Sequence, residues 1–331
     1  WPFGIPIMAD ADWLIEVDQL TRRFPRCEAL GGISFRVRRG EIAALLGPNG
    51  SGKTTTLRIL SGYLAPSSGR VRVAGCDLQT HPLDARRRIG YLPESAPLPL
   101  DMRVAEYLAF RGRLRGLRGR HLTVRLREVA DRCGLGDVWR RRLGSLSRGF
   151  RQRTGLADCL LHEPDVLLLD EPLAGLDPAQ VQAVQEWLKE AGRQGAVLFS
   201  THVLSEVEPL CQQALILNAG RLAAADSPGR IARASARLRA ELFAPADRLA
   251  AALEALPGAS DIRLQPIADG WTDVGFHSGP EELSGSLEDL AAVHHWPIRC
   301  VRRESRTFAE AYLRLTSALP IVKNPAQRRA S

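Results

Sequence analysis

Residues 47–55 of this chain read Gly-Pro-Asn-Gly-Ser-Gly-Lys-Thr-Thr and match the phosphate-binding pattern G-x-x-x-x-G-K-[ST]. The mostly apolar run at residues 41–46 predicts a buried strand before this loop, and residues 54–60 predict a helix after it. In that context the backbone N–H groups of the loop and the positive end of the helix converge on an anion. We therefore predict that the loop binds the phosphates of a nucleoside triphosphate, through Gly47, Pro48, Asn49, Gly50, Ser51, Gly52, Lys53, Thr54 and Thr55.

Two residues of the loop and two acids farther along the chain carry the predicted chemistry. Lys53 is expected to reach the β- and γ-phosphates, and the hydroxyl of Thr54 is expected to bind Mg²⁺. The apolar strand at residues 166–169 ends in Asp170 and Glu171. Asp170 is placed to hold Mg²⁺ directly or through water, and Glu171 is placed to polarise the water that attacks the γ-phosphate. Adjacent acids at the end of a sheet are uncommon as a purely structural feature, because uncompensated charge there is costly.

The surrounding sequence, residues 13–228, predicts an α/β domain. Alternating apolar and polar residues predict strands of a half-exposed sheet, and short apolar runs predict buried strands. Helices between the buried strands imply a largely parallel sheet, with the functional loops at the strand ends. Residues 101–162 instead carry apolar residues at helical spacing among arginines, which predicts a helical insert. The predicted strands are residues 14–18, 33–37, 41–46, 69–73, 89–94, 166–169, 196–200 and 214–217.

A second, smaller α+β domain is predicted for residues 237–316. Its order of elements, β-α-β-β-α-β, is that of a ferredoxin-like unit. Because no phosphate loop, acid pair or metal spacing accompanies it, we expect it to take no part in hydrolysis and to serve as a dimer contact or a ligand sensor. Residues 1–12 are interpreted as an N-terminal extension and residues 317–331 as a polar tail. The predicted elements are strands 238–243, 262–267, 271–277 and 298–302 and helices 246–256, 280–294 and 307–315.

The net charge of +8 comes from an unusual set of basic residues. Of the 45 basic side chains three are lysines, and the other 42 are arginines. Residues 111–142 hold eleven of these arginines, and we interpret them as a mostly solvated basic surface that can face anionic lipid headgroups. No nucleic-acid partner is expected.

The six cysteines and the hydropathy of the chain bear on its location. The cysteines show no metal-binding spacing and are expected to be small buried residues in a reducing compartment. No apolar run approaches the roughly 18 residues that a membrane span needs. Residues 1–7 lack the basic flank and the length of a signal peptide. We predict a cytoplasmic protein that reaches a membrane only through a partner.

Six segments, taken together and in order, resemble the ATP-binding subunits of ABC transporters over about residues 13–228. The resemblance implies a P-loop NTPase domain of the ABC ATPase type, in which residues 101–162 form the helical subdomain. About 50 residues separate the fourth segment from the third, as the family pattern requires. The segments are Phe24, which stands in a polar turn; residues 47–54; Glu94; Leu-Ser-Arg-Gly-Phe-Arg-Gln-Arg at residues 146–153; residues 167–171 with 174–177; and Ser-Thr-His at residues 200–202.

The resemblance also assigns roles to residues. It implies that Phe24 stacks on adenine, although the residues alone leave open a simple core anchor. It implies that Glu171, His202 and Glu94 act in hydrolysis, and that Thr54, Asp170 and Glu94 hold Mg²⁺. Asp177 stands before Pro178 in the capping position of a helix. The further ATP contacts that the resemblance implies are Ser147, Gly149 and Asp177.

Two departures from the family pattern stand out. Glu94 occupies a position where most of the family has Gln, and its charge could change the coupling between ATP and the transporter. The signature reads Leu-Ser-Arg-Gly-Phe, so Arg148 and Phe150 replace the usual Gly and Gln. Both departures are similar to a bacterial export-type subset that includes gliding-motility, copper-associated and multidrug ATPases.

The family resemblance implies a motor that works as a dimer. The signature of one subunit closes on ATP held by the loop of another, and the helix predicted at residues 150–161 offers its N-terminus to that phosphate. The predicted protein is the ATP-hydrolysing subunit of a membrane exporter, bound to a transmembrane permease subunit and to a second nucleotide-binding domain, as a homodimer. A soluble ABC ATPase that acts on the ribosome or DNA, and a regulatory ATP-binding module, are the alternatives.

Overall fold

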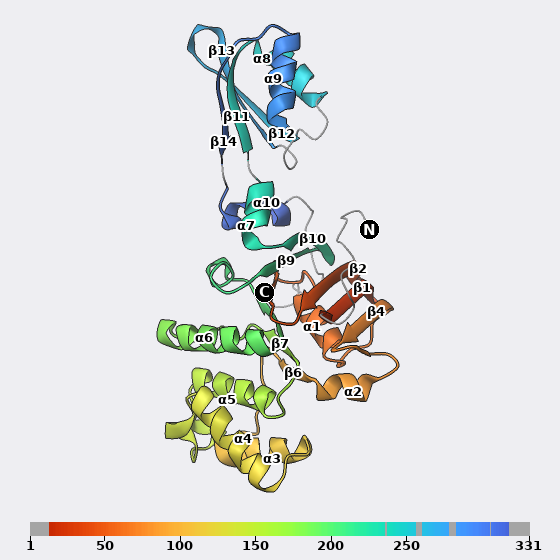
Figure 1. Cartoon of the computed structure of the whole chain (residues 1–331), viewed down its shortest axis with the longest axis vertical. Coiled ribbons are helices and arrows are strands. Elements are labelled where there is room, and N and C mark those ends of the chain that lie inside the picture. Colours follow the sequence, from red (N-terminus) through yellow and green to blue (C-terminus); the bar gives the residue numbers. More distant parts are fainter. Residues whose placement is uncertain (1–12, 236, 256–259, 278–282, 305, 318–331) are drawn as a thin grey trace. The chain divides into compact units, whose positions relative to one another are not determined.

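The chain divides into two compact units in the computed structural model (Figure 1). Unit 1 comprises residues 1–225 and 316–331, and unit 2 comprises residues 226–315. The predicted extension and all but the first residue of the predicted tail lie outside the described residues. The structure describes residues 13–235, 237–255, 260–277, 283–304 and 306–317.

The first sheet of unit 1 is antiparallel, with the strand order β2-β1-β4-β5. Strands β1 and β2 pair from Trp13 opposite Arg38 to Phe24 opposite Cys27, so they form one long hairpin. Both strands exceed their predicted lengths, because register shifts interrupt the alternation on which the prediction relied. Phe24 is therefore the last residue of a strand, and its predicted place in a turn was wrong. The strands are β1 (Trp13–Phe24), β2 (Cys27–Arg38), β4 (Ser68–Val73) and β5 (Cys76–Asp77).

The second sheet of unit 1 has the order β10-β9-β3-β8-β7-β6. Strands β3, β7 and β8 are buried along their whole lengths, as expected for apolar strands covered on both faces. The pairs β3–β8, β7–β8, β6–β7 and β3–β9 are parallel, as predicted, so the carboxyl ends of β3, β8 and β7 lie side by side. The strands are β3 (Ile42–Leu46), β6 (Ile89–Leu92), β7 (Val166–Asp170), β8 (Ala196–Thr201), β9 (Gln213–Asn218) and β10 (Arg221–Asp226).

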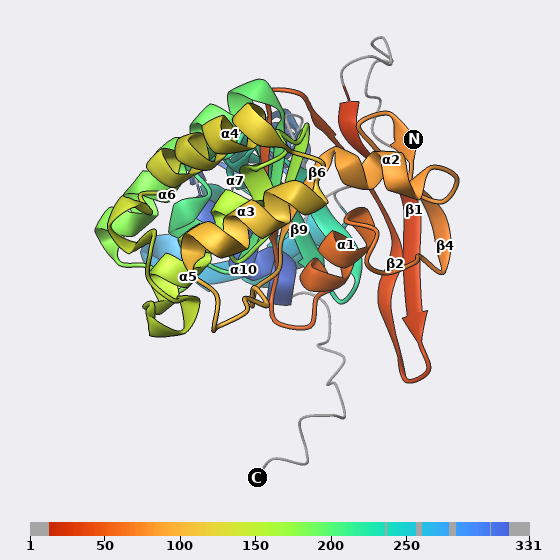
Figure 2. The same cartoon turned by 90° about the horizontal axis from the view of Figure 1, so that it is seen from below.

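Helix α1 (Lys53–Leu60) joins the two sheets into one core (Figure 2). Leu57, Ile59 and Leu60 are buried in a cluster that includes apolar side chains from β1, β2 and β4 and from β3, β7 and β8. Each fully buried leucine or isoleucine contributes roughly 1.5–3 kcal/mol relative to an exposed one. The helix that opens after the phosphate loop is therefore fixed by the core on both sides. The other helices of unit 1 outside the insert are α2 (Pro82–Arg87) and α6 (Pro178–Gln194).

The predicted insert at residues 101–162 is helical (Figure 2). Helix α5 begins two residues earlier than predicted, because the Ser147 side chain accepts a hydrogen bond from the Phe150 N–H and caps the helix. The basic stretch is not wholly solvated. Arg125 is 6% exposed, since its guanidinium reaches the carbonyl oxygens of Leu160 and Leu161 and pairs with two glutamates. The helices are α3 (Val104–Leu114), α4 (Gly119–Arg132) and α5 (Arg148–Leu160), and the paired glutamates are Glu128 and Glu163.

Unit 2 contains a four-stranded antiparallel sheet with the order β12-β13-β11-β14. The order β-α-β-β-α-β along the chain is the predicted one, and "ferredoxin-like" remains our interpretation of it. The last helix runs to Ser317, two residues beyond its predicted end. The elements are α7 (Pro228–Ala234), β11 (Arg237–Phe243), α8 (Ala246–Glu254), β12 (Ser260–Pro266), β13 (Trp271–His277), α9 (Leu283–Val293), β14 (Ile298–Glu304) and α10 (Phe308–Ser317).

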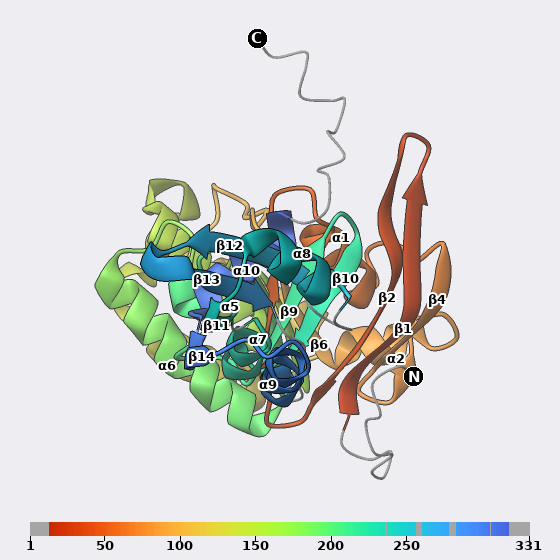
Figure 3. The same ribbon diagram turned by 90° about the horizontal axis from the view of Figure 1, so that it is seen from above.

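The two faces of the unit 2 sheet differ. Leu238, Ala240 and Leu242 of β11 alternate toward one face, where they form a buried cluster with side chains from β13, α8 and α9. Figure 3 shows helices α8 and α9 together with the strands of this sheet. The residues between them, Arg239 and Glu241 among others, are only partly buried. The sheet therefore has one face under helices α8 and α9 and one face carrying charged side chains.

The cysteines only partly follow expectation. Cys133, Cys159 and Cys211 are buried, whereas Cys27 is exposed and Cys76 and the sixth, Cys300, are half-buried. Within the described ranges, no helix combines the length and the apolar character that crossing a membrane requires.

Candidate nucleotide-binding site

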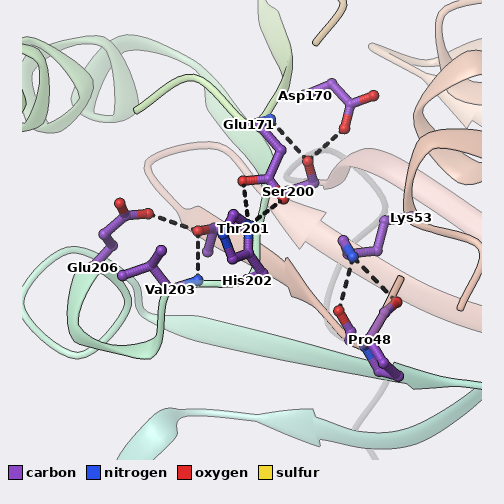
Figure 4. A network of polar contacts seen from close by, with 10 residues as sticks. Pro48, Lys53, Asp170, Glu171, Ser200, Thr201, His202, Val203 and Glu206 are labelled. Carbon is purple, nitrogen blue, oxygen red and sulfur yellow. Dashed lines mark hydrogen bonds and ion pairs between the residues drawn. The ribbon is translucent and has the colours of Figure 1, made fainter. Parts of the chain in front are cut away.

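The candidate site lies at the carboxyl ends of β3, β7 and β8. The phosphate loop follows β3, Asp170 ends β7 and Thr201 ends β8. Because these parallel strands are neighbours in the sheet, the residues that follow them meet at one edge. Figure 4 shows Lys53, Asp170, Glu171 and His202 gathered there.

The loop approaches its surroundings so closely that glycine is required at two positions. A Cβ on Gly47 would lie 2.2 Å from the carbonyl oxygen of Leu217 and 2.5 Å from Oγ of Ser51. Gly52 has φ +108, and a Cβ there would lie 2.7 Å from the Leu30 side chain. Gly52 is also the N-cap of α1 and provides no side-chain cap, so the first N–H groups of the helix stay available to a ligand.

Lys53 is buried at the start of α1, with 7% of its surface exposed. Its Nζ donates to the carbonyl oxygens of Gly47 at 2.8 Å and Pro48 at 3.3 Å (Figure 4). Burial lowers the pKa of Lys53, and the negative charges of Glu171, Asp170 and Glu94 oppose that shift. A buried ammonium on which three carboxylates act electrostatically is suited to hold an anion between itself and a metal ion.

Ser200, at the penultimate position of β8, binds both acids. Its hydroxyl donates to Oδ1 of Asp170 at 2.6 Å and accepts the N–H of Glu171 at 2.9 Å. Oδ2 of Asp170 is buried and has no hydrogen-bond partner among the described residues. Glu171 has φ +51, which few residues other than glycine adopt, so its N–H bond to Ser200 secures a strained backbone. The motif Ser-Thr-His at residues 200–202 was recognised from the sequence, but no role was predicted for Ser200 itself.

His202 meets Glu171 across the gap between the ends of β8 and β7. Its Nδ1 lies 3.0 Å from both carboxylate oxygens of Glu171. An ionised carboxylate can only accept, so in this contact Nδ1 carries the proton and donates. The His202 side chain is 61% exposed, whereas that of Glu171 is 14% exposed. The structure thus brings together two of the three residues that the resemblance assigned to hydrolysis.

Thr201 and Glu206 form a further contact at the end of β8, which was not predicted from the sequence. Thr201 is 1% exposed, and its hydroxyl donates to Glu206 at 2.7 Å and accepts the N–H of Val203 at 3.0 Å (Figure 4). The pKa of the Glu206 carboxyl is raised by burial, and the hydrogen bond from Thr201 opposes that shift. Nothing in the local sequence except the acid four residues beyond a histidine could have pointed to this contact.

Phe24 and Glu94 lie on elements other than the phosphate loop, at the end of β1 and after β6. Phe24 is 38% exposed at the end of its hairpin strand, and the Arg22 guanidinium lies 4.6 Å from its ring. The alternative interpretation of Phe24 as a core anchor is therefore wrong. Glu94 is exposed in the loop after β6, close enough for its charge to act on Lys53.

The signature residues form a separate cluster. Ser147 caps α5, and Asp177 caps α6 by accepting the N–H of Gln180 at 2.9 Å. Gly149 is buried where a Cβ would lie 2.5 Å from Oε1 of Gln180, so these two helix starts touch. Within the described residues, no hydrogen bond or ion pair joins the phosphate loop to Ser147, Gly149 or Asp177 of the same chain.

Comparisons with known proteins agree with this geometry. A family model described as ABC transporter matches residues 30–174. The uncharacterized ABC transporter ATP-binding protein YxlF of Bacillus subtilis (strain 168) is 41% identical over 209 residues, which cover 63% of this chain and 69% of the relative. The Nod factor export ATP-binding protein I of Ralstonia nicotianae is 36% identical over 65% of this chain and 67% of its own length. A solved structure of an ATP-binding subunit of an ABC transporter aligns with a TM-score of 0.62 and 32% identity, covering 66% of this chain and 92% of that one.

Proposed function

Because this chain belongs to the ABC transporter ATP-binding proteins, we propose that it drives export across a membrane by ATP-dependent closure of a homodimer. Proteins of this family are ATPases with a P-loop NTPase fold, and they act as ATP-driven motors of transporters. They dimerise and work with permease components. Export, the homodimer and the roles of individual residues are the parts that we propose.

The contact between His202 and Glu171 is the observation that carries the proposal. A water that attacks the γ-phosphate needs a group that accepts its proton, and Glu171 lies one residue beyond Asp170 at the strand end. The His202 Nδ1 donates to the Glu171 carboxylate and so holds it in one orientation. We assign Glu171 as the base and His202 as the residue that orients it.

The remaining polar groups fit ATP with Mg²⁺. Oδ2 of Asp170 is a buried oxygen without a partner in the described chain, and a carboxylate oxygen of this kind is the ligand that Mg²⁺ prefers. Asp170, Thr54 and Glu94 would hold the metal ion, and Lys53 with residues 47–55 would hold the phosphates. The ion neutralises phosphate charge when bound. Phe24, exposed at the end of β1, would offer its ring to adenine.

The separate signature cluster supports a site shared by two chains. The N-terminus of α5 carries a positive partial charge, and Ser147 at its cap is exposed. Because no bond ties Ser147, Gly149 or Asp177 to the loop of their own chain, a phosphate held by a second copy is the partner that we assign to them. Such a phosphate would link two chains and convert ATP binding into closure.

Export is supported by the name of one relative, the Nod factor export ATP-binding protein I, and by the two departures from the common motif. We place the chain on the cytoplasmic face of a membrane, bound to a permease subunit. The compound transported would be selected by that subunit.

Glu171→Gln tests the hydrolytic part of the proposal. The glutamine keeps the size of the side chain and loses the base, so turnover should fall about a hundredfold or more while ATP affinity stays at the wild-type value. An ATP-bound dimer should accumulate, which size-exclusion chromatography with and without ATP would detect. Wild-type turnover in this variant would remove Glu171 from the role of base.

Direction of transport needs a test in cells. The chain would be expressed with the membrane protein encoded beside its gene, and growth would be measured against a panel of toxic compounds. If the pair exports, cells with the wild-type pair should tolerate a higher concentration of at least one compound than cells without it. Cells with Glu171→Gln should show no such increase. Increased sensitivity that depends on Glu171 would instead indicate import.

A further inference from the structure

We propose that Glu206 is a positioning residue for hydrolysis, which acts by fixing the hydroxyl of Thr201 and, through it, the turn that carries His202. The inference rests on the proposed function, because it concerns the same contact between His202 and Glu171. It adds a residue that does not touch the nucleotide. Each step follows from the contacts at the end of β8 (Figure 4).

The first step concerns the single proton of the Thr201 hydroxyl. That hydroxyl lies 2.7 Å from Oε2 of Glu206 and 3.0 Å from the N–H of Val203. A carboxylate can only accept and an N–H can only donate, so the proton must point to Glu206 and a lone pair must face Val203. Glu206 therefore decides which way the hydroxyl is turned.

The second step concerns the backbone on either side of His202. Thr201 and Val203 are its two chain neighbours, and the hydroxyl bond between them closes a turn around it. The N–H of Glu206 donates to the carbonyl oxygen of Val203 at 3.3 Å, which closes the next turn, η3 (Leu204–Glu206). Val207 follows with no exposed surface, so the segment is anchored where Glu206 begins its reach back to Thr201.

The third step is that His202 needs this support. Its side chain is 61% exposed and gains little orientation from packing. The contact with Glu171 is the hydrogen bond that the described structure gives its ring, so the position of the ring depends on its own backbone. If the turn relaxes, Nδ1 moves away from Glu171 and the base loses its orientation, while the phosphate loop on β3 is untouched.

This chain of contacts predicts a loss in kcat with no loss in nucleotide affinity. Glu206→Ala should lower kcat about tenfold or more, which is the expected scale for losing one hydrogen bond to a charged group in a positioning role. The KM for ATP and the affinity for a non-hydrolysable ATP analogue should stay within about twofold of wild type. Glu206→Gln should restore most of kcat, because its amide oxygen still accepts from Thr201. Glu208→Ala is the matched control, since Glu208 is exposed two residues farther on and should have wild-type kcat.

Two further variants separate positioning from folding. Thr201→Val should lower kcat as much as Glu206→Ala, and the double variant should lose no more, because the two residues act through one contact. Glu206→Asp keeps the charge but withdraws it from Thr201 by one methylene, so it should resemble the alanine variant. Thermal unfolding measured on each variant corrects kcat for the folded fraction.

A wild-type kcat in folded Glu206→Ala would overturn the inference. An equally large loss of kcat in Glu206→Ala and Glu206→Gln would also overturn it. A loss that follows the unfolded fraction alone would also overturn it. Failure of the proposed function would give a different result, because the Glu171→Gln variant would then hydrolyse ATP at the wild-type rate. If Glu171→Gln is inactive and Glu206→Ala is fully active, only the role of Glu206 is lost.

Discussion

The two units of this chain both gather charged residues on a sheet, and they treat the charges in opposite ways. At the strand ends of unit 1, Asp170 and Glu206 are bound by the hydroxyl groups of Ser200 and Thr201, and the carboxylate of Glu171 is bound by the ring of His202. On the open face of the unit 2 sheet, several arginines pair with carboxylates. Arg239 pairs with Asp273 at 2.6 Å and Glu304 at 3.0 Å, Arg299 pairs with Glu241 and lies over the ring of Trp271, and Arg237 pairs with Asp261.

This difference indicates what each region is built to receive. Hydroxyl groups orient an acid without neutralising it, so the buried Oδ2 of Asp170 and the buried ammonium of Lys53 keep their capacity for a ligand. Ion pairs consume the charges that form them, so the unit 2 face has little left for a charged ligand. We expect substitutions at the first region to change function and substitutions at the second to change stability.

Lys53→Ala should have the largest effect on ATP binding. If it had little effect, the contrast between the ligand-binding charges of unit 1 and the paired charges of unit 2 would be wrong. Removing the buried ammonium leaves the phosphates without their cation and leaves the charges of Asp170, Glu171 and Glu94 unopposed. ATP affinity should fall about a hundredfold or more, measured by titration with a fluorescent ATP analogue. Lys189→Ala is the control, because that lysine is partly exposed on α6 and paired with Glu186 three residues away. Equal affinities for the two variants would show that Lys53 does not contact the phosphates.

The sequence could predict the first region well because its signals are local. The phosphate loop needs glycine at Gly47, where a Cβ would come within 2.2 Å of the carbonyl oxygen of Leu217, so a fixed spacing appears in the sequence. Asp170 ends, and Glu171 follows, a strand whose other four residues are apolar, which places both acids at the end of a buried sheet. The helix capped by Asp177 was also readable, because Pro178 follows at its first position.

What the sequence could not predict depends on contacts between distant residues. Arg125 looks like one more solvated arginine until α5 supplies the carbonyl oxygens of Leu160 and Leu161, 35 and 36 residues away. The orientation of the Thr201 hydroxyl depends on a hydrogen bond to the Glu206 carboxylate. The spacing of apolar and polar residues in the sequence does not predict that hydrogen bond. The long hairpin of β1 and β2 was underestimated because its register shifts hide the alternation.

Phe24→Ala should have an intermediate effect on ATP affinity. It extends the comparison to a residue that would bind ATP through an uncharged ring. If the ring stacks on adenine, its loss should weaken ATP binding about tenfold, within the range of roughly 1–3 kcal/mol for one base on an aromatic side chain. Phe24→Tyr should bind like wild type, because stacking tolerates either ring. The measurement is the same fluorescence titration.

Phe110→Ala is the matched control for Phe24. Phe110 is also an exposed aromatic residue, 48% exposed on α3 within the helical insert, and it should leave ATP affinity unchanged. If Phe24→Ala also binds ATP normally, the ring serves only as a surface for the Arg22 guanidinium that lies over it.

Arg239→Ala should have the smallest effect on ATP hydrolysis and tests the other half of the comparison. Arg239 bridges Asp273 of β13 and Glu304 of β14, so its removal leaves two carboxylates without their shared cation. Unit 2 should unfold at a lower temperature, and added salt should reduce the difference from wild type because it screens the carboxylates. Turnover should stay within about twofold of wild type, since this face holds none of the residues assigned to hydrolysis.

Arg302→Ala is the control for Arg239→Ala, because the two variants should change the unfolding temperature of unit 2 differently. Arg302 lies opposite Arg239 in the β11–β14 register and is exposed, so its removal takes away a like charge and should not lower the unfolding temperature of unit 2. Calorimetry and turnover measured on the same samples separate the two effects. If folded Arg239→Ala lost more than about half of its turnover while Arg302→Ala did not, the ion-paired face would contribute to hydrolysis, and the contrast between the two units would be wrong.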